Sequence, residues 1–154
     1  MNFEIDFDEP GIGRQSRSMP LANGAFVHDL CAARTFCCKS DVETMHRNGL
    51  ALGGSVENAI VFDDGAVLSP GGLRHDDEPV RHKMLDAVGD LALAGSPLIA
   101  KYSGYKAGHT LTNMLLAELF SDPRNYRVLE CDAAQLAALP GAGLKTGDLE
   151  DLPG

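Results

Sequence analysis

The sequence predicts an α+β fold, a two-layer sandwich in which a small mixed sheet packs against two main helices and carries a βαβ insertion. Residues 2–7 alternate apolar and polar side chains, which is typical of a strand with one buried face. Two longer segments, 78–93 and 109–121, have helical lengths and end before Gly95 and Pro123. Short apolar runs around a helical pattern separate the first strand from these helices and indicate the insertion.

The segment before the insertion predicts extended pieces and one short helix. A second extended stretch runs from residue 15 to residue 21, and a further short one covers 34–36. Between them an amphipathic helix is expected to begin at residue 23 or 24. Its apolar side carries Phe26, Val27, Leu30 and Cys31.

The insertion, about residues 37–62, follows from a strand–helix–strand order within a short stretch of chain. Ser40 begins an S-x-x-E capping box, which predicts the start of a helix there. Asn48-Gly49 is a typical helix end. The apolar runs 50–52 and 59–62 are the strand candidates.

Each principal helix has its own start signal. Acidic side chains at 76–78 stand directly before Pro79, where the helix dipole favours negative charge and the fixed φ of proline suits the first turn. A strand over 98–105 is expected to lead into the second helix, which begins near Gly108.

Length and C-terminal composition predict one domain with an extension. A chain of 154 residues suits a single ordinary domain. Arg127-Val128-Leu129 predicts a terminal strand, and the segment 132–154, rich in Ala, Gly, Pro and Asp, predicts a flexible tail. We therefore expect a domain over 1–123, followed by the strand and tail over 124–154.

Charge and cysteine content exclude several classes of function. The 13 Lys and Arg residues against 22 Asp and Glu give a net charge of −9, which opposes nucleic-acid binding. The sequence has no apolar run of about 18 residues for a transmembrane helix. The acidic start MNFEIDFDEP does not resemble a signal peptide, so a cytoplasmic location is expected. Reduced thiols are expected, rather than a zinc knuckle, because no CxxC spacing links Cys31, Cys37, Cys38 and Cys131.

One helix face concentrates residues that bear chemistry. His82, Asp86 and Asp90 follow one another at i, i+4 and i+8, so all three share a face. An imidazole and a carboxylate one turn apart suit Zn²⁺, and Asp90, one turn further, suits a partner that orients another group. The spacing alone is weak evidence for a metal site, because such polar pairs are common on helices and a solvated helix face with incidental charges is the more frequent explanation.

Among the other histidines, His109 is the strongest candidate for a functional role. It follows Gly108 at a strand-to-helix junction, where a side chain can point into a cleft. A cationic imidazole at a helix N-terminus needs a carboxylate partner, and Asp90 is the candidate. Surface positions are expected for the remaining three, His28, His46 and His75.

Several ordered motifs together resemble the UDP-3-O-acyl-N-acetylglucosamine deacetylase family, zinc amidohydrolases of lipid A and hence lipopolysaccharide biosynthesis. The resemblance extends from about Asn2 to about Pro123. The motifs are IDFD (5–8), ARTF (33–36), LALGGSVENAIV (50–61), GLR (72–74), VRHKMLDAVGDL (80–91), PLI (97–99) and YKAGHTLTN (105–113).

The resemblance implies a role for each matching catalytic position. His82 and Asp86 correspond to two of the three protein ligands of Zn²⁺. His109 corresponds to the catalytic histidine, a protonated electrostatic stabiliser and an acid toward the leaving amine, and Asp90 to its carboxylate partner. Thr35 corresponds to the residue that helps hold the reacting carbonyl and its oxyanion.

The resemblance also implies contacts with a UDP-linked, acylated glucosamine substrate. Lys83 corresponds to the residue that meets the diphosphate, and Phe36 to part of the sugar-nucleotide site. The insertion resembles the βαβ element that shapes a hydrophobic passage for the acyl chain. The expected lining residues are Val42, Met45, Ala51, Ser55 and Val61.

Only the second of the two similar domains of this family is represented in the sequence. The first domain carries a TxEH-type motif that supplies the third zinc ligand and the glutamate general base, and no such segment occurs here. The expected partner is therefore a separate N-terminal-type domain, without which the chain is not expected to turn over substrate. The alternatives are a truncated or decayed non-catalytic copy and a module that binds diphosphate and acyl chain.

Overall fold

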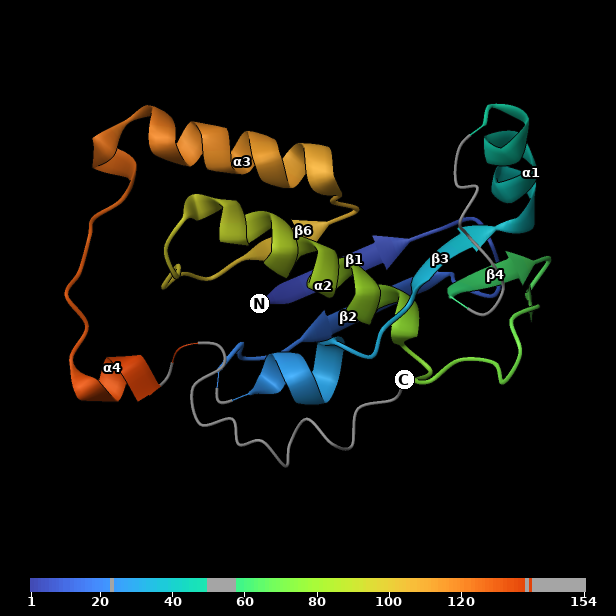
Figure 1. Ribbon diagram of the computed structural model, residues 1–154, viewed down its shortest axis with the longest axis horizontal. Helices are drawn as coiled ribbons and strands as arrows, with labels where there is room; N and C mark the ends of the chain where they lie inside the picture. Colours follow the sequence, from blue (N-terminus) through green and yellow to red (C-terminus); the bar gives the residue numbers. More distant parts are fainter. Residues whose placement is uncertain (23, 50–57, 138, 140–154) are drawn as a thin grey trace.

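The computed structural model describes residues 1–22, 24–49, 58–137 and 139, and these form the expected α+β fold (Figure 1). The strands are β1 (Asn2–Asp6), β2 (Arg14–Ser18), β3 (Thr35–Cys38), β4 (Ala59–Asp63), β5 (Ala66–Val67) and β6 (Ser103–Tyr105). The α-helices are α1 (Lys39–Arg47), α2 (Glu78–Leu91), α3 (His109–Ser121) and α4 (Ala133–Ala137). A π-helix spans Phe26–Leu30, and 3-10 turns span Ala92–Ala94 and Pro123–Asn125.

The first sheet has the order β2-β1-β6 and supplies one layer of the sandwich. β1 pairs antiparallel with β2 and parallel with β6, with Glu4 opposite Tyr105. The alternation expected for 2–7 is confirmed, since Phe3 and Ile5 are buried between less buried neighbours. These two side chains join the core beneath the sheet.

The second sheet confirms the βαβ insertion. β3 and β4 pair in parallel, with Thr35 opposite Ala59, and α1 lies between them in the chain. β5 pairs antiparallel with β4. The strand expected at 50–52 lies outside the described residues.

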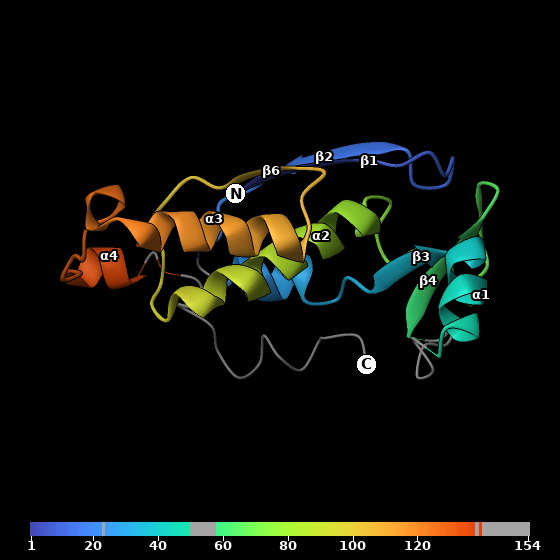
Figure 2. The same cartoon turned by 90° about the horizontal axis from the view of Figure 1, so that it is seen from above.

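The principal helices form the layer next to the first sheet (Figure 2). α2 buries Val80, Met84 and Ala87, which recur at helical spacing and pack into the same core as Phe3 and Ile5. Side chains of β4 reach this core as well, so the two sheets share it. Because α3 packs beside α2, the end of one helix approaches the start of the other.

Two expected extended segments are shorter than the sequence suggested. The strand predicted over 98–105 is confined to Ser103–Tyr105, because β6 pairs only with the first three residues of β1. The stretch 15–21 forms β2 only as far as Ser18.

The C-terminal expectations are partly wrong. Residues 127–129 form no strand; none of the described strands pairs with them, and Val128 is 88% exposed. Within the expected flexible tail, Ala133–Ala137 is helical. Of the rest of that tail, residues 132 and 139 are described, and the others lie outside the described residues.

None of the helices formed by the described residues has the length and apolar character needed to cross a membrane. The cytoplasmic location stays a prediction.

Candidate functional site

His82 and Asp86 lie one turn apart on α2 and touch. Nε2 of His82 is 3.2 Å from Oδ1 of Asp86, and each side chain is 15% exposed. Nδ1 of His82 is 3.3 Å from the carbonyl oxygen of Ala33. In the tautomer that donates to this carbonyl, Nε2 carries the free lone pair on the side of Asp86. The two side chains thus present one nitrogen and one oxygen atom side by side, each able to ligate a metal ion.

Lys83 approaches the other oxygen of the same carboxylate. Its Nζ donates to Oδ2 of Asp86 over 2.7 Å, and its side chain is 17% exposed. Asp86 therefore lies between an imidazole on one oxygen and an ammonium group on the other.

The contact expected between His109 and Asp90 is present. Nδ1 of His109 lies 2.9 and 3.0 Å from the two carboxylate oxygens of Asp90. His109 is the first residue of α3, while Asp90 lies in the last turn of α2, so the packing of the two helices creates the pair. The Asp90 side chain is 13% exposed and that of His109 is 65% exposed. A mostly buried carboxylate thus orients an accessible imidazole, whose Nε2 is on the opposite side of the ring.

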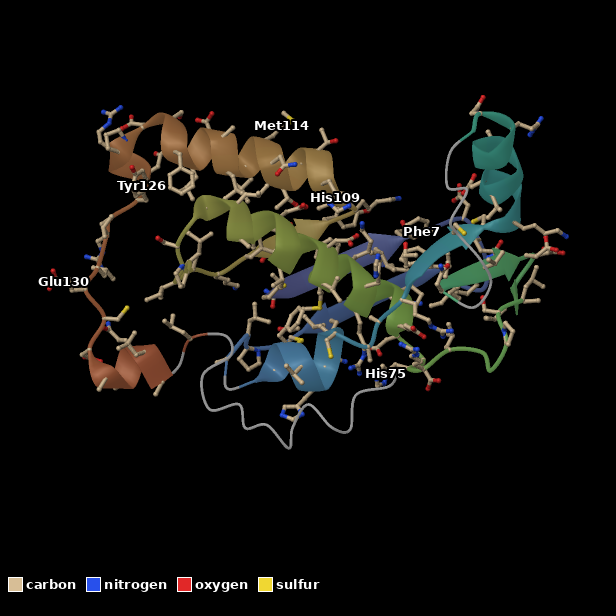
Figure 3. The ribbon with its side chains drawn as sticks, viewed as in Figure 1. Phe7, His75, His109, Met114, Tyr126 and Glu130 are labelled. Carbon is tan, nitrogen blue, oxygen red and sulfur yellow. The ribbon has the colours of Figure 1, made fainter. Side chains whose placement is uncertain are left out.

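These groups meet at one cavity of about 480 Å³. Figure 3 shows His109 at the beginning of α3, with Phe7 on the side toward β3. The cavity is lined by Phe7, Thr35, Phe36, His82, Lys83, Asp86 and His109. All of these except Phe7 are residues that the sequence singled out; Asp90 reaches the cavity through His109 rather than as part of its wall.

Aromatic packing fixes one wall of the cavity. The ring of Phe36 packs edge-on against Phe7 at 5.4 Å, against His82 at 6.0 Å and against the buried Phe62 at 6.5 Å, centroid to centroid. Phe36 therefore connects the imidazole to the core. Phe7 was not among the site residues predicted from the sequence, although its odd position continues the apolar stripe of Phe3 and Ile5 just beyond the end of β1.

Thr35 is positioned by a buried ion pair beside it. The carboxylate of Glu78 is fully buried and accepts hydrogen bonds from the backbone N, Nε and Nη2 of Arg34 and from the backbone N of Arg74. Burial alone raises the pKa of Glu78, but the hydrogen bonds from Arg34 and Arg74 outweigh it and hold the pKa below its ordinary value. From the sequence, Glu78 was predicted only as a residue at the start of a helix. Its buried carboxylate instead fixes the start of α2 to the residue before Thr35.

The residues expected to line an acyl passage are only partly described. Val42 is half-buried on α1 and Val61 is buried in β4. Met45 belongs to α1, but its side chain is not described, and Ala51 and Ser55 lie outside the described residues. The passage therefore stays a prediction.

The donors present fit part of a zinc site. An imidazole nitrogen and a carboxylate oxygen are ordinary Zn²⁺ ligands, and the carbonyl of Ala33 is the kind of outer partner that orients a ligating histidine. Catalytic zinc normally has three protein ligands. In the part of the chain that the structure describes, no third His, Cys, Asp or Glu completes such a group.

Comparisons with known proteins agree on one family. A family model described as UDP-3-O-acyl N-acetylglycosamine deacetylase matches residues 1–121. A UDP-3-O-acyl-N-acetylglucosamine deacetylase of Psychrobacter arcticus is 46% identical over 134 residues, which cover 86% of this chain and 42% of the relative. One of Acinetobacter baumannii (strain AYE) is 46% identical over 142 residues, covering 91% of this chain and 47% of the relative. The chain thus spans less than half the length of these relatives.

Proposed function

Because the chain belongs to the UDP-3-O-acyl N-acetylglycosamine deacetylase family, we propose that it forms one half of a zinc-dependent deacetylase of lipid A biosynthesis. The reaction hydrolyses the N-acetyl group of UDP-3-O-acyl-N-acetylglucosamine to acetate and a free amine. The observation that carries the proposal is the cavity at which His82 and Asp86 meet the His109–Asp90 pair. The comparisons do not favour the alternatives of a non-catalytic copy or a binding module.

His82 and Asp86 would hold Zn²⁺ together with a ligand from outside the described residues. When bound, the metal supplies a polarised amide carbonyl and an activated water. What this half contributes to the chemistry is then the stabilisation of charge and the delivery of a proton.

His109 is suited to both tasks. Hydrolysis places negative charge on the carbonyl oxygen, and the amine must receive a proton as the C–N bond breaks. An imidazolium paired with Asp90 provides positive charge and a proton on one side chain. We propose that the hydroxyl of Thr35, which lines the same cavity, donates to the carbonyl oxygen.

Lys83 and Phe36 are proposed as substrate contacts. An ammonium group at the cavity suits a diphosphate, which needs a cation. The exposed edge of the aromatic wall formed by Phe36 and Phe7 suits the flat surfaces of a sugar nucleotide.

The general base and the third zinc ligand are proposed to come from a complementary domain. Within the part of the chain that the structure describes, α3 carries an exposed apolar face formed by Leu111, Met114 and Leu115, which are each about half exposed or more. Figure 3 shows Met114 on the side of α3 away from α2. His109 begins this same helix, so a domain that covers the face also reaches the cavity. The relatives contain more than enough additional chain for such a domain.

The test is reconstitution. The chain is mixed with Zn²⁺ and the part of the Acinetobacter baumannii relative that it does not cover, and acetate release from UDP-3-O-acyl-N-acetylglucosamine is measured. Acetate is expected only when both proteins are present. His109→Ala should lower kcat by about 100-fold or more. Asp90→Asn should lower kcat less, because the imidazole remains.

His28→Ala is the matched control, since His28 is exposed on the π-helix. It should leave the rate unchanged. A mixture that forms a complex by gel filtration yet releases no acetate contradicts the proposal, as does full activity of His109→Ala.

A further inference from the structure

The carboxylate of Asp86 contacts two groups in the same site. One oxygen lies 3.2 Å from Nε2 of His82, the nitrogen assigned to the metal, and the other lies 2.7 Å from the ammonium of Lys83. All three side chains are at least four-fifths buried, so water screens these charges weakly. Without metal, Lys83 therefore neutralises Asp86.

A divalent cation at His82 and Asp86 changes that balance. Metal and ammonium would then share one carboxylate at close range, and their mutual repulsion is strong in a partly desolvated site. The carboxylate cannot be the full counter-ion of both. Lys83 itself lines the cavity, so its long side chain has open space into which the ammonium can move.

We propose that Lys83 is the internal counter-cation of Asp86 and that a divalent metal displaces its ammonium from the carboxylate into the cavity. This inference rests on the proposed function only in taking His82 and Asp86 as metal ligands. The displaced ammonium is then available to an anionic group of the substrate. Metal and diphosphate consequently bind with positive coupling, each favouring the state in which Lys83 has left Asp86.

The first measurement uses the unmodified protein. Lysines are labelled briefly with an amine-acetylating reagent over a series of Zn²⁺ concentrations, and the acetylation of each lysine is measured by mass spectrometry. Labelling of Lys83 should rise several-fold with Zn²⁺ as its ammonium leaves Asp86. Labelling of the exposed Lys101 serves as the internal reference and should stay constant. The rise should disappear in His82→Ala.

The second measurement is Zn²⁺ affinity by calorimetry. Lys83→Met removes the competing charge and should tighten Zn²⁺ binding by about tenfold or more. Lys101→Met is the matched control and should leave the affinity unchanged. If Lys83 instead orients Asp86 as a metal ligand, Lys83→Met weakens Zn²⁺ binding. That result overturns the proposed displacement of Lys83.

The remaining outcomes also decide whether a divalent metal displaces Lys83 from Asp86. Labelling of Lys83 that stays flat or falls while calorimetry shows bound Zn²⁺ overturns the displacement, even if Lys83→Met binds more tightly through simple loss of repulsion. Failure of both wild type and Lys83→Met to bind Zn²⁺ at millimolar concentration overturns it together with the metal site. Acetate release by the reconstituted pair is measured separately. If the pair is active but the labelling of Lys83 does not change with Zn²⁺, the displacement of Lys83 is rejected and the proposed function is retained.

Discussion

At the scale of single residues, Glu78 explains how the loop before β3 is held at the cavity. Its buried carboxylate receives three hydrogen bonds from Arg34 and one from Arg74. Such a charge is tolerable inside a protein only because its partners are fixed around it. Arg34 directly precedes Thr35, so this ion pair governs the position of a residue that lines the site.

Glu78→Gln tests this anchor through stability. The change leaves the Arg34 guanidinium without its counter-ion and should lower the free energy of unfolding by about 3 kcal/mol in urea titrations near neutral pH. Because the pKa of Glu78 is lowered in the folded state, its contribution is present above the ordinary carboxyl pKa of about 4.3. That contribution is lost as the pH falls through the lowered value.

The difference between wild type and Glu78→Gln should therefore shrink in acid. Glu130→Gln, at an exposed position, is the matched control and should change stability by less than about 0.5 kcal/mol. A constant difference between Glu78→Gln and wild type down to low pH would show that the charge of Glu78 is not what stabilises the fold.

The residues on the face of α2 could be predicted from the sequence, but their contacts could be predicted only in part. Spacing along one helix is enough to align His82, Asp86 and Asp90, because helical geometry is local. The proximity of Asp90 to His109 needed the additional premise of a charged imidazole at a helix start. Lys83 and Asp86 have the i,i+3 spacing that allows an ion pair on a helix, but whether the pair forms depends on which rotamer the surroundings allow.

At the scale of elements, helices were easier to predict than strands. α2 and α3 have clear signals at both ends and a long apolar stripe or run, so their bounds agree with the sequence to within a few residues. A strand continues only while a neighbour pairs with it, and that neighbour is distant in sequence. This is why 98–105 shortens to β6 and why 127–129 forms no strand.

Two glycines give opposite predictions for one substitution. A Cβ at Gly104 in β6 would lie 2.6 Å from the ring of Phe3, which is buried and has little room to move. Gly104→Ala should therefore lower the free energy of unfolding by about 1–3 kcal/mol. A Cβ at Gly89 in α2 would meet nothing within 4 Å, so Gly89→Ala should raise that free energy by up to about 1 kcal/mol through helix propensity.

Both effects are measured by urea unfolding of the chain. The two variants make the same chemical change, so any general effect of adding a methyl group cancels between them. If Gly104→Ala is as stable as wild type, then Phe3 does not pack against β6 as tightly as the structure indicates.

At the scale of the whole molecule, the site exists only because the core joins all the elements around it. Phe7 follows β1, Thr35 and Phe36 belong to β3, and the remaining lining residues come from α2 and α3. Core residues of β1, β4 and α2 form one cluster, which fixes these elements relative to one another. The sequence motifs named most of the participants, but only the tertiary packing brings them to one cavity.

The exposed apolar face of α3 is the feature of the whole molecule that bears on the proposed complementary domain. Met114 is 62% exposed and points away from α2 (Figure 3), so Met114→Glu should change the stability of the isolated chain by less than about 0.5 kcal/mol. If a complementary domain covers this face, the same change places a charge in a desolvated contact.

The affinity of Met114→Glu for the part of the Acinetobacter baumannii relative that this chain does not match should then be lower than that of wild type by about 30-fold or more, measured by calorimetry. Acetate release should recover when that partner is supplied in excess, because the chemistry of the cavity is intact and only association is weakened. Leu68→Glu places the same charge at another exposed apolar position, after β5, and should leave association unchanged. Equal affinity of wild type and Met114→Glu would show that the partner docks elsewhere, and His109 would then have to be reached from a face other than the outer side of its own helix.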